Sequence, residues 1–388
     1  MPVLDLIAQQ ATELTRIRRD IHAHPEIGFE EHRTSSLVAE KLAEWGIEVH
    51  RGIGGTGVVG LVHGKGEGPS IGLRADMDAL PMEELTNASH RSTKSGVFHG
   101  CGHDGHTTML LGAAHYLAAT RNFPGKIVLI FQPAEEGLGG AVAMIRDGLF
   151  ERFPCDEIYA LHNWPGAEVG KTTTRCGVAM AASDNFDIVI SGRGAHGAQP
   201  HNSIDPIMVA ASLAQALQTI VSRNVDPLSS ATLSITQIHG GSAYNVIPDN
   251  VTLSGTIRTF DEATRALIAE RMRAISMGVA QGFGAEVEVS IRKGFRVLEN
   301  SAPHAEAAID IARTIVGDER VGFDADPMSG SEDFADMLAL VPGAYLWLGQ
   351  GKTAALHNPH YDFNDEILPI GASLLAKIGE TRTQALRA

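Results

Sequence analysis

The sequence has few cysteines, few aromatic residues and no long apolar run. Its three cysteines are Cys101, Cys155 and Cys176, and aromatic residues make up 5% of the chain. So sparse and odd a set of cysteines argues against a disulfide-stabilised extracellular domain and fits a reducing compartment. The first ten residues lack a basic segment followed by an apolar one. We therefore expect no signal peptide, no membrane span and a cytoplasmic location.

Basic residues are also in deficit. The chain has 31 lysines and arginines against 46 aspartates and glutamates, which gives a formal net charge of −15 at pH 7. An acidic surface argues against nucleic acid or an anionic membrane as the main partner, because like charges repel. A small anionic substrate stays compatible, since one nearby arginine outweighs the distant field. At 388 residues the chain is long enough for two domains.

The order of the predicted elements differs between the outer parts of the chain and its middle part. The outer parts alternate short apolar strands with helices, which predicts an α/β domain with a largely parallel sheet. The helices are expected at 3–22, 107–119, 141–150, 303–316, 332–340 and 368–384, and the strands at 57–62, 70–75, 126–131, 157–161 and 344–348.

The middle part predicts a strand at 185–190, a helix at 206–223, strands at 231–238 and 251–260, a helix at 262–282 and a strand at 285–291. This β-α-β-β-α-β order is that of a ferredoxin-like unit. We therefore predict an α/β/α catalytic domain, residues 1–181 and 294–388, interrupted by an inserted ferredoxin-like α+β domain, residues 182–293. Three consecutive domains are the alternative. Insertion is favoured because candidate chemical residues fall on both sides of the middle part.

The densest group of potential metal ligands is the segment 99–106, His-Gly-Cys-Gly-His-Asp-Gly-His. Thiolate and imidazole groups bind borderline metals such as zinc, and glycine lets the backbone crowd around an ion. By itself the segment is equally compatible with a glycine-rich turn that carries surface histidines. It makes Cys101 and His103 candidate ligands.

A pair of carboxylates, Glu135 and Glu136, directly follows the predicted strand 126–131. Open α/β sheets place their sites at the carboxyl ends of strands. Neighbouring side chains can point differently, so one glutamate can bind a metal while the other carries a proton. A lone Glu-Glu pair is otherwise more often a solvated acidic turn.

Other candidates end further strands or lie near the end of the chain. His162 ends one strand, Asp76 and Asp78 end another, and His357 lies close to the C-terminus. An Asp that bonds to a metal-ligating His commonly orients it, whereas a lone His is more often structural. A soft ligand, three imidazoles and paired acids together exceed the needs of one ion, which favours two metals.

The middle part carries three further candidates. His196 lies in a segment that joins a strand to a helix, Asn245 lies between two strands, and Arg258 lies within a strand. An arginine can clamp a carboxylate through two parallel hydrogen bonds. The plain alternatives are a turn histidine and an ordinary surface ion pair.

In their order along the chain these motifs resemble the aminoacylase/hippuricase group of bimetallic metallopeptidases. The resemblance covers essentially the whole chain, through the segments 20–26, 74–81, 99–106, 132–137, 194–201, 243–248, 328–334 and His357. The broader family commonly has His-x-Asp where this sequence has Asp76-Met77-Asp78, and Cys101 stands where that family has a bridging Asp. Both departures are typical of the hippurate hydrolase and auxin-conjugate hydrolase branch.

The resemblance implies a metal-dependent hydrolase of linear amides, which cleaves N-acyl-L-amino acids of the hippurate or N-acetyl type. The alternative is a dipeptidase or an N-acetyl-diaminopimelate deacetylase of the same family. Two divalent ions (zinc, manganese, nickel or cobalt) are implied. Their implied ligands are Cys101, His103, Glu136, His162 and His357.

The resemblance also implies roles for the remaining candidates. Glu135 would be the general base and Asp78 an orienting residue. The implied contacts to substrate or transition state are His196, Asn245, Arg258 and Gly330, with Asn245 and Arg258 gripping the substrate carboxylate. The inserted domain would form a homodimer or homotetramer, and His196 would act in its own or in the partner's site.

Two other interpretations stay open. Cys101 could be a nucleophile with His103 as its base, but the spacing is poor for that pair and leaves Glu135 without a role. A chelator would not inhibit such an enzyme. A metal-storing protein would need no proton carrier beside its ligands, and a hydrolysis assay separates it from an enzyme.

Overall fold

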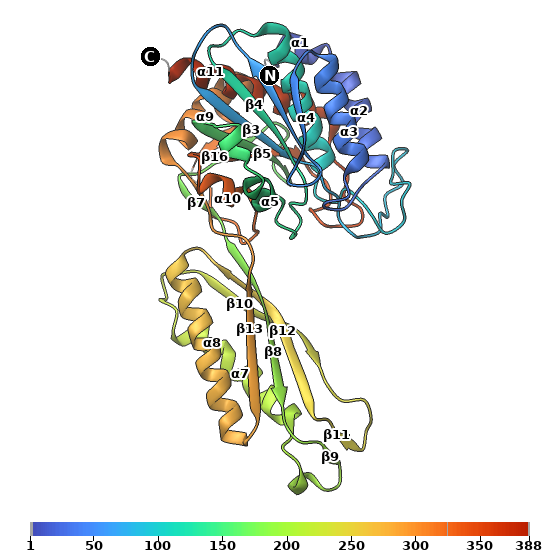
Figure 1. The fold of residues 1–388 in the computed structure, drawn as a ribbon, viewed down its shortest axis with the longest axis vertical. Coiled ribbons are helices and arrows are strands. Elements are labelled where there is room, and N and C mark those ends of the chain that lie inside the picture. Colours follow the sequence, from blue (N-terminus) through green and yellow to red (C-terminus); the bar gives the residue numbers. More distant parts are fainter. Residues whose placement is uncertain (1–2, 324, 387–388) are drawn as a thin grey trace. The chain divides into compact units, whose positions relative to one another are not determined.

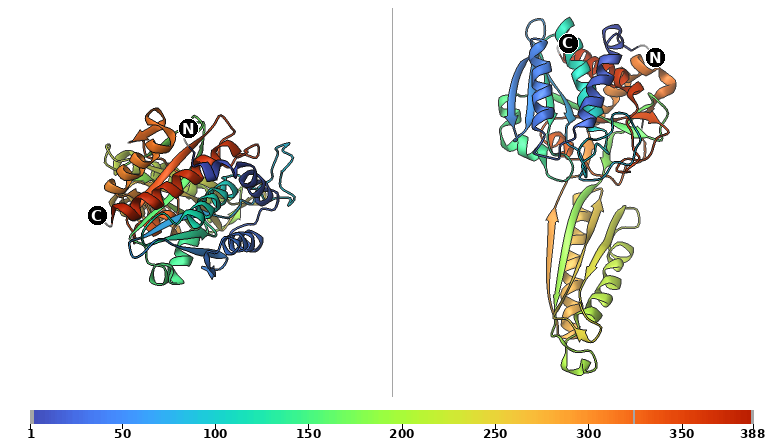
Figure 2. Two further views of the ribbon diagram at one scale, coloured as in Figure 1. Left: turned by 90° about the horizontal axis from the view of Figure 1, so that it is seen from above. Right: turned by 90° about the vertical axis from the view of Figure 1, so that its right-hand side faces the viewer.

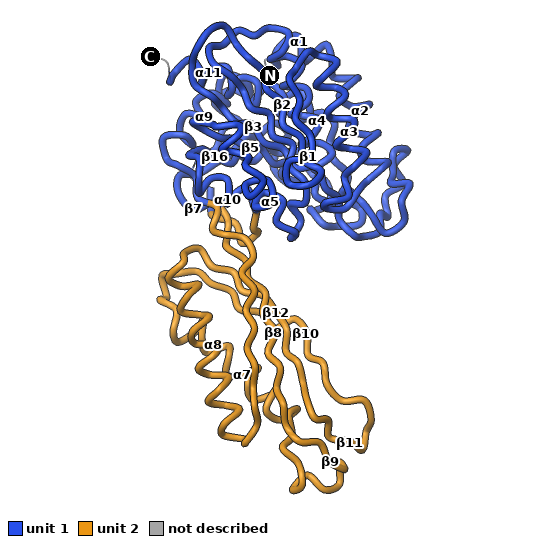
Figure 3. The backbone as a smooth tube through the Cα atoms, viewed as in Figure 1, with its two compact units in different colours: residues 1–179, 299–326, 333–388 blue, residues 180–298, 327–332 orange. Residues whose placement is uncertain are grey.

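The computed structural model describes residues 3–323 and 325–386, and the chain divides into two units (Figure 1, Figure 3). Unit 1 comprises Met1–Ala179, Glu299–Asp326 and Asp333–Ala388, as far as these ranges are described. Unit 2 comprises Met180–Leu298 and Pro327–Glu332. Residues 180–181, 294–298 and 327–332, which the predicted division gave to the outer domain, cluster with unit 2. Residues 1, 2, 324, 387 and 388 of the predicted outer domain lie outside the described residues.

Unit 1 is built on an eight-stranded mixed sheet with the strand order β1-β2-β4-β3-β5-β16-β6-β15. The strands are β1 (Glu48–Ile53), β2 (Gly57–His63), β3 (Ser70–Asp76), β4 (Lys126–Gln132), β5 (Glu157–Pro165), β6 (Thr172–Thr174), β15 (Val321–Phe323) and β16 (Gly343–Gly351). The central four, β4, β3, β5 and β16, are parallel. β1, β2 and β6 make antiparallel pairs, so the sheet is mixed at its flanks rather than parallel throughout.

Uninterrupted burial shows that both faces of the central sheet are covered. Every residue of β3 is buried, and β4 is buried from its second residue onward. Successive side chains of a strand point to opposite faces, so such strands need a layer on each side. The covering helices are α1 (Asp5–Ala8), α2 (Ala11–Ala23), α3 (His32–Glu44), α4 (His103–Thr120), α5 (Gly140–Arg146), α6 (Leu149–Arg152), α9 (Ala302–Val316), α10 (Phe334–Leu338) and α11 (Leu368–Ala385). The predicted α/β/α layering is confirmed.

Two predicted helices are broken in the structure. The expected helix at 3–22 is divided between α1 and α2, and the one at 141–150 is divided between α5 and α6. Gly148, at φ 82°, separates α5 from α6, because a left-handed residue cannot continue a right-handed helix. Conversely, α4 begins at His103, four residues earlier than predicted, so the candidate metal motif runs directly into a helix.

Unit 2 confirms the ferredoxin-like order. Its elements are β8 (Ala182–Ser191), α7 (Pro206–Arg223), β10 (Ala231–His239), β12 (Asn250–Thr259), α8 (Glu262–Phe283) and β13 (Glu286–Lys293). The antiparallel sheet has the order β10-β12-β8-β13, with α7 and α8 on one face (Figure 2). Burial alternates along β8, as expected of a sheet covered on one side.

Smaller pairings complete the topology. β9 (Ala195–His196) pairs with β11 (Val246–Ile247), and β14 (Leu298–Asn300) pairs with β7 (Gly177–Met180). Among the described helices, none combines the length and the apolar character that crossing a membrane requires.

Candidate metal centre

The candidate residues of unit 1 lie around the carboxyl ends of its parallel strands. Asp76 ends β3, Glu135 and Glu136 follow β4, His162 lies near the end of β5, and His357 follows β16. Because these four strands are parallel, their carboxyl ends meet at one edge of the sheet. The N-terminal end of α4 brings Cys101 and His103 to the same place.

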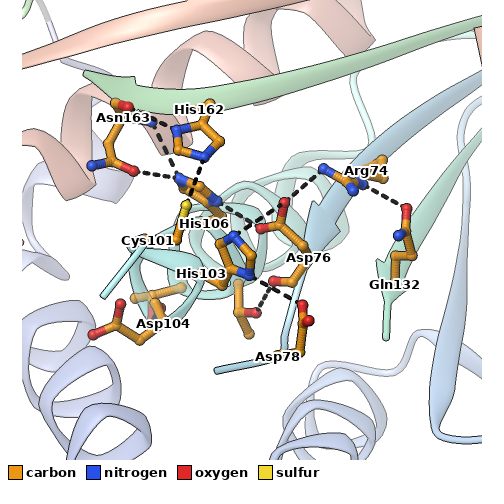
Figure 4. A network of polar contacts seen from close by, with 12 residues as sticks. Arg74, Asp76, Asp78, Cys101, His103, Asp104, His106, Gln132, His162 and Asn163 are labelled. Atoms are coloured by element: carbon orange, nitrogen blue, oxygen red, sulfur yellow. Dashed lines mark hydrogen bonds and ion pairs between the residues drawn. The ribbon is translucent and has the colours of Figure 1, made fainter. Parts of the chain in front are cut away.

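Two groups of three ligand atoms share the Cys101 thiol. One consists of Cys101, His103 and His162, and the other of Cys101, Glu136 and His357; within each group the atoms lie within 4.8 Å of one another. The Cys101 Sγ lies 3.5 Å from His162 Nε2 (Figure 4). The His357 Nε2 lies 3.2 Å from Glu136 Oε1. The five residues predicted as metal ligands are therefore brought together, with Cys101 between two adjacent triads.

Two buried atoms of this cluster, His103 Nε2 and Glu136 Oε1, make no hydrogen bond among the described residues. The contact of Glu136 Oε1 with His357 is close enough for an ion pair but does not have hydrogen-bond geometry. Buried polar atoms without partners are costly, and they call for an explanation such as an ion. Sulfur, nitrogen and oxygen donors together suit borderline divalent metals. The cluster therefore fits two divalent cations.

Asp78 connects the two triads. Its Oδ1 pairs with His103 Nδ1 at 3.1 Å, which leaves Nε2 of that imidazole directed at the cluster. Its Oδ2 accepts a hydrogen bond of 2.9 Å from the backbone N–H of Glu136. One buried carboxylate thus orients a member of each triad.

The environment sets which protons a cation would have to displace. Burial holds the pKa of His162 well below its usual value, so this imidazole is neutral and ready to bind a metal. Burial, together with the Glu136 carboxylate, raises the pKa of Cys101. The adjacent Cys101 thiol and Glu136 carboxylate raise the pKa of His357 to about 10. Protons and cations therefore compete for these ligands.

A buried hydrogen-bonded chain behind the cluster was not predicted. Asp76 Oδ1 lies 2.6 Å from His106 Nδ1, and His106 Nε2 lies 2.7 Å from Asn163 Oδ1 (Figure 4). Both ring nitrogens of His106 are occupied, so it supports the cluster although it belongs to the same motif as Cys101. Arg74 Nη1 donates to Asp76 Oδ2 at 2.7 Å. Two charged residues, Arg74 and Asp76, lie in a strand whose other residues are mostly apolar. Because charged residues in a buried strand need polar partners, they could have indicated this chain.

Unit 2 distributes its predicted substrate contacts between two ends of its sheet. His196 pairs with Val246 in the β9–β11 ladder, and the N–H of Gly197 donates to the Asn245 carbonyl at 2.7 Å. Arg258 lies near the far end of β12, opposite Ser183 of β8.

Gly330 belongs to the Arg258 end, because its carbonyl accepts a hydrogen bond from the N–H of Ala181, which precedes β8. At about 3.3 Å per residue, β12 separates Arg258 from Asn250 by roughly 26 Å. Asn245 lies beyond Asn250, directly before β11, which pairs with β9. A single copy of unit 2 therefore keeps Asn245 and Arg258 far apart, and their joint contact with one carboxylate stays a prediction that requires a second copy.

The sequence model of peptidase family M20/M25/M40 matches residues 72–381 of the chain. The hippurate hydrolase of Campylobacter jejuni subsp. jejuni is 45% identical over 94% of this chain and 95% of its own length. The N-acetyl-L-cysteine deacetylase of Bacillus subtilis is 41% identical over 93% of this chain and 86% of its own length.

A solved structure is similar to this chain over nearly its whole length. The Bacillus subtilis YXEP protein, a dinuclear metal-binding peptidase from the M20 family, superimposes with a TM-score of 0.85 at 33% identity. The match covers 97% of this chain and 99% of that one.

Proposed function

The chain belongs to peptidase family M20/M25/M40, and from this we propose that it is a two-metal amidohydrolase of N-acyl-L-amino acids. The products are a carboxylic acid and a free amino acid. The observation that carries this proposal is the pair of ligand triads that share Cys101, with Glu135 beside them. The activities of the relatives support this substrate class ahead of a dipeptidase or an N-acetyl-diaminopimelate deacetylase.

We propose Cys101, His103, Glu136, His162 and His357 as the ligands of two divalent cations. When bound, such a pair supplies an activated water and polarises the scissile carbonyl. Zinc, manganese, nickel and cobalt all suit this donor set, and availability decides among them.

Glu135 is the proposed proton carrier. Its carboxylate lies within 4.8 Å of the ligand atoms of His103 and Glu136, and its side chain is buried. It accepts a proton as water adds to the amide carbonyl, and it returns that proton to the amide nitrogen as the C–N bond breaks. Asp78 holds His103 in the orientation that this arrangement requires.

For unit 2 we propose that the residues at its two ends act in the sites of different subunits. Arg258 binds the carboxylate of the substrate through parallel hydrogen bonds, near Gly330. His196 and Asn245 serve the site of a second subunit, in a homodimer or homotetramer formed through unit 2. The separation of the two ends of β12 supports this, as do the exposed apolar side chains of Ile238 and Tyr244 on this unit.

Co-expressing His196→Ala with Glu135→Gln chains tests the sharing of sites. Each variant alone should be nearly inactive. The co-expressed population should recover about a quarter of the wild-type activity, because about half of all dimers would be mixed and each mixed dimer would hold one complete site of two. No recovery would contradict a contribution from the partner.

The cysteine-nucleophile alternative has less support. His103 Nδ1 is engaged by Asp78, and burial raises the pKa of Cys101, which disfavours the free thiolate that a nucleophile needs.

All three cysteines are free, which supports the cytoplasmic location that we propose.

The proposal is tested with chelator-stripped enzyme reloaded with zinc, manganese, nickel or cobalt. Hippurate, N-acetyl amino acids, N-acetyl-diaminopimelate and dipeptides form the substrate panel. We expect no activity in the stripped enzyme, two bound ions per reloaded chain, and the highest kcat/KM on N-acyl amino acids. Full activity without metal, or a dipeptide as the best substrate, would refute it.

A further inference from the structure

Two adjacent glutamates reach the same site, which an extended strand does not allow. Carboxylate oxygens of both Glu135 and Glu136 lie within 4.8 Å of a ring nitrogen of His103. Neighbouring side chains of a strand point to opposite faces, so the chain must turn just after β4. The turn occurs at Ala134, whose φ is 54°. This is the left-handed region, which residues with a Cβ rarely adopt.

The backbone of Ala134 is held on both sides. Its N–H donates a hydrogen bond of 2.8 Å to Glu31 Oε1, and its carbonyl accepts one of 2.9 Å from the N–H of Gly140. Ala134 is fully buried. Strained backbone of this kind persists only where its surroundings over-determine it, so these two contacts are what hold the turn.

Glu31 is a buried carboxylate with a specific pair of partners. It is 0% exposed and lies directly before α3. Its second oxygen accepts a hydrogen bond from the Thr56 hydroxyl. The segment that carries it packs tightly on the turn, because a Cβ at Gly28 would lie 2.9 Å from the Cα of Ala134.

The backbone N–H groups of the two residues that flank Glu135 are thus bound by different carboxylates. Asp78 accepts from the N–H of Glu136, and Asp78 also orients the candidate ligand His103. Glu31 accepts from the N–H of Ala134. Among the described residues, the hydrogen bonds of the Glu31 side chain go to Ala134 and Thr56 and to no candidate ligand. The two carboxylates therefore have separable effects.

We propose that Glu31 is a positioning residue, which aims the Glu135 carboxylate by holding Ala134 in its left-handed conformation. This inference rests on the proposed role of Glu135 as the proton carrier. Loss of Glu31 should then lower the rate of the chemical step and leave the metal ligands in place. Gln at position 31 should substitute well, because its amide can accept from Ala134 while its NH₂ group donates to Thr56.

The metal-loaded enzyme tests this on Glu31→Ala, Glu31→Gln and the double variant Glu31→Ala/Ala134→Gly. Glu31→Ala should lower kcat on the order of 10- to 100-fold, with KM nearly unchanged and two ions retained. Glu31→Gln should stay within about threefold of wild type. The double variant should regain part of the lost kcat, because glycine adopts a positive φ without a steric penalty.

Glu157 offers a matched control, since it is another buried carboxylate of unit 1, bound by Arg382 and Tyr159. Glu157→Ala should lower the thermal stability with kcat near that of wild type. If Glu31→Ala does not fold, Glu31→Asp is used instead. Its carboxylate is one methylene shorter and so lies farther from the N–H of Ala134.

Wild-type kcat in Glu31→Ala, or metal loss in proportion to activity loss, would overturn the inference. Crystal structures of the metal-loaded variants test it without any assay: φ at residue 134 should change and the Glu135 carboxylate should move in Glu31→Ala but not in Glu31→Gln. Should wild type hydrolyse no N-acyl amino acid, the proposed function fails, and these structures still decide the role of Glu31.

Discussion

The candidate residues of unit 1 converge, whereas those of unit 2 separate. In unit 1 the strands β4, β3, β5 and β16 run parallel, so the residues that follow them collect at one edge. In unit 2 the strands are antiparallel, so successive connections lie at alternate ends of the sheet. Arg258 and Asn245 lie at opposite ends for that reason. One chain therefore holds a complete candidate metal cluster but not a complete set of predicted substrate contacts.

The largest effect is expected where the two triads meet. Cys101→Ala removes a ligand from both, so bound metal should fall from two ions per chain towards none and activity should disappear. His357→Ala, which belongs to one triad, should lose one ion. Metal content measured by atomic absorption after dialysis checks this. Cys155→Ala, also in unit 1, should keep both ions; one tightly held ion in Cys101→Ala would show that the thiol is not shared.

Glu135→Gln should separate catalysis from metal binding within unit 1. Removing a proton carrier lowers kcat by about 10²- to 10⁴-fold, whereas the two triads stay complete and two ions should remain bound. Steady-state kinetics with parallel metal analysis measures both quantities. Glu151→Gln, at an exposed position on α6, should behave as wild type. Near-normal turnover in Glu135→Gln would remove it from the mechanism.

The Arg258 end of unit 2 should affect binding more than turnover. Losing a charge-assisted hydrogen bond costs roughly 1.5–3 kcal/mol, which corresponds to about a 10- to 150-fold rise in KM. Arg258→Ala should show this rise on N-acyl amino acids, and Arg292→Ala, at an exposed pair with Asp187, should not. Carboxamide analogues of the substrates provide the comparison. An equal loss on those analogues would argue against a carboxylate clamp.

The last effect concerns the stability of unit 1 and its dependence on pH. Burial opposes charge on His22, but the Asp104 carboxylate at 2.8 Å outweighs it and raises the pKa to about 9. A raised pKa stabilises the fold fully below the unfolded value of 6.5, and the gain is lost as the pH rises through 9. The difference in unfolding free energy between wild type and His22→Gln should therefore shrink by about 3 kcal/mol across that window.

Chemical denaturation at saturating metal from pH 6 to 10 measures this difference. His24→Gln, at a half-exposed pair with Asp20, should follow wild type at every pH. A difference between wild type and His22→Gln that does not change with pH would contradict the assignment.

Strong periodicity and capping made much of the fold predictable. The helix at 206–223 was predicted with its observed bounds, and in the structure Asp205 caps it and Pro206 opens it. α3 and β1 were missed. β1 has the sequence Glu-Val-His-Arg-Gly-Ile and is largely exposed at the sheet edge, so it shows no clean alternation of apolar and polar residues. The break between α1 and α2 was missed because amphipathic spacing continues across it.

By itself the sequence determined the chemistry of the metal cluster and the two-unit organisation, because ligand type and hydrophobic period are local properties. Only the tertiary structure decided that Ala134 is left-handed and that Asn245 lies far from Arg258. These facts depend on distances between segments far apart in the chain. Packing and strand direction set such distances, and no local pattern encodes them.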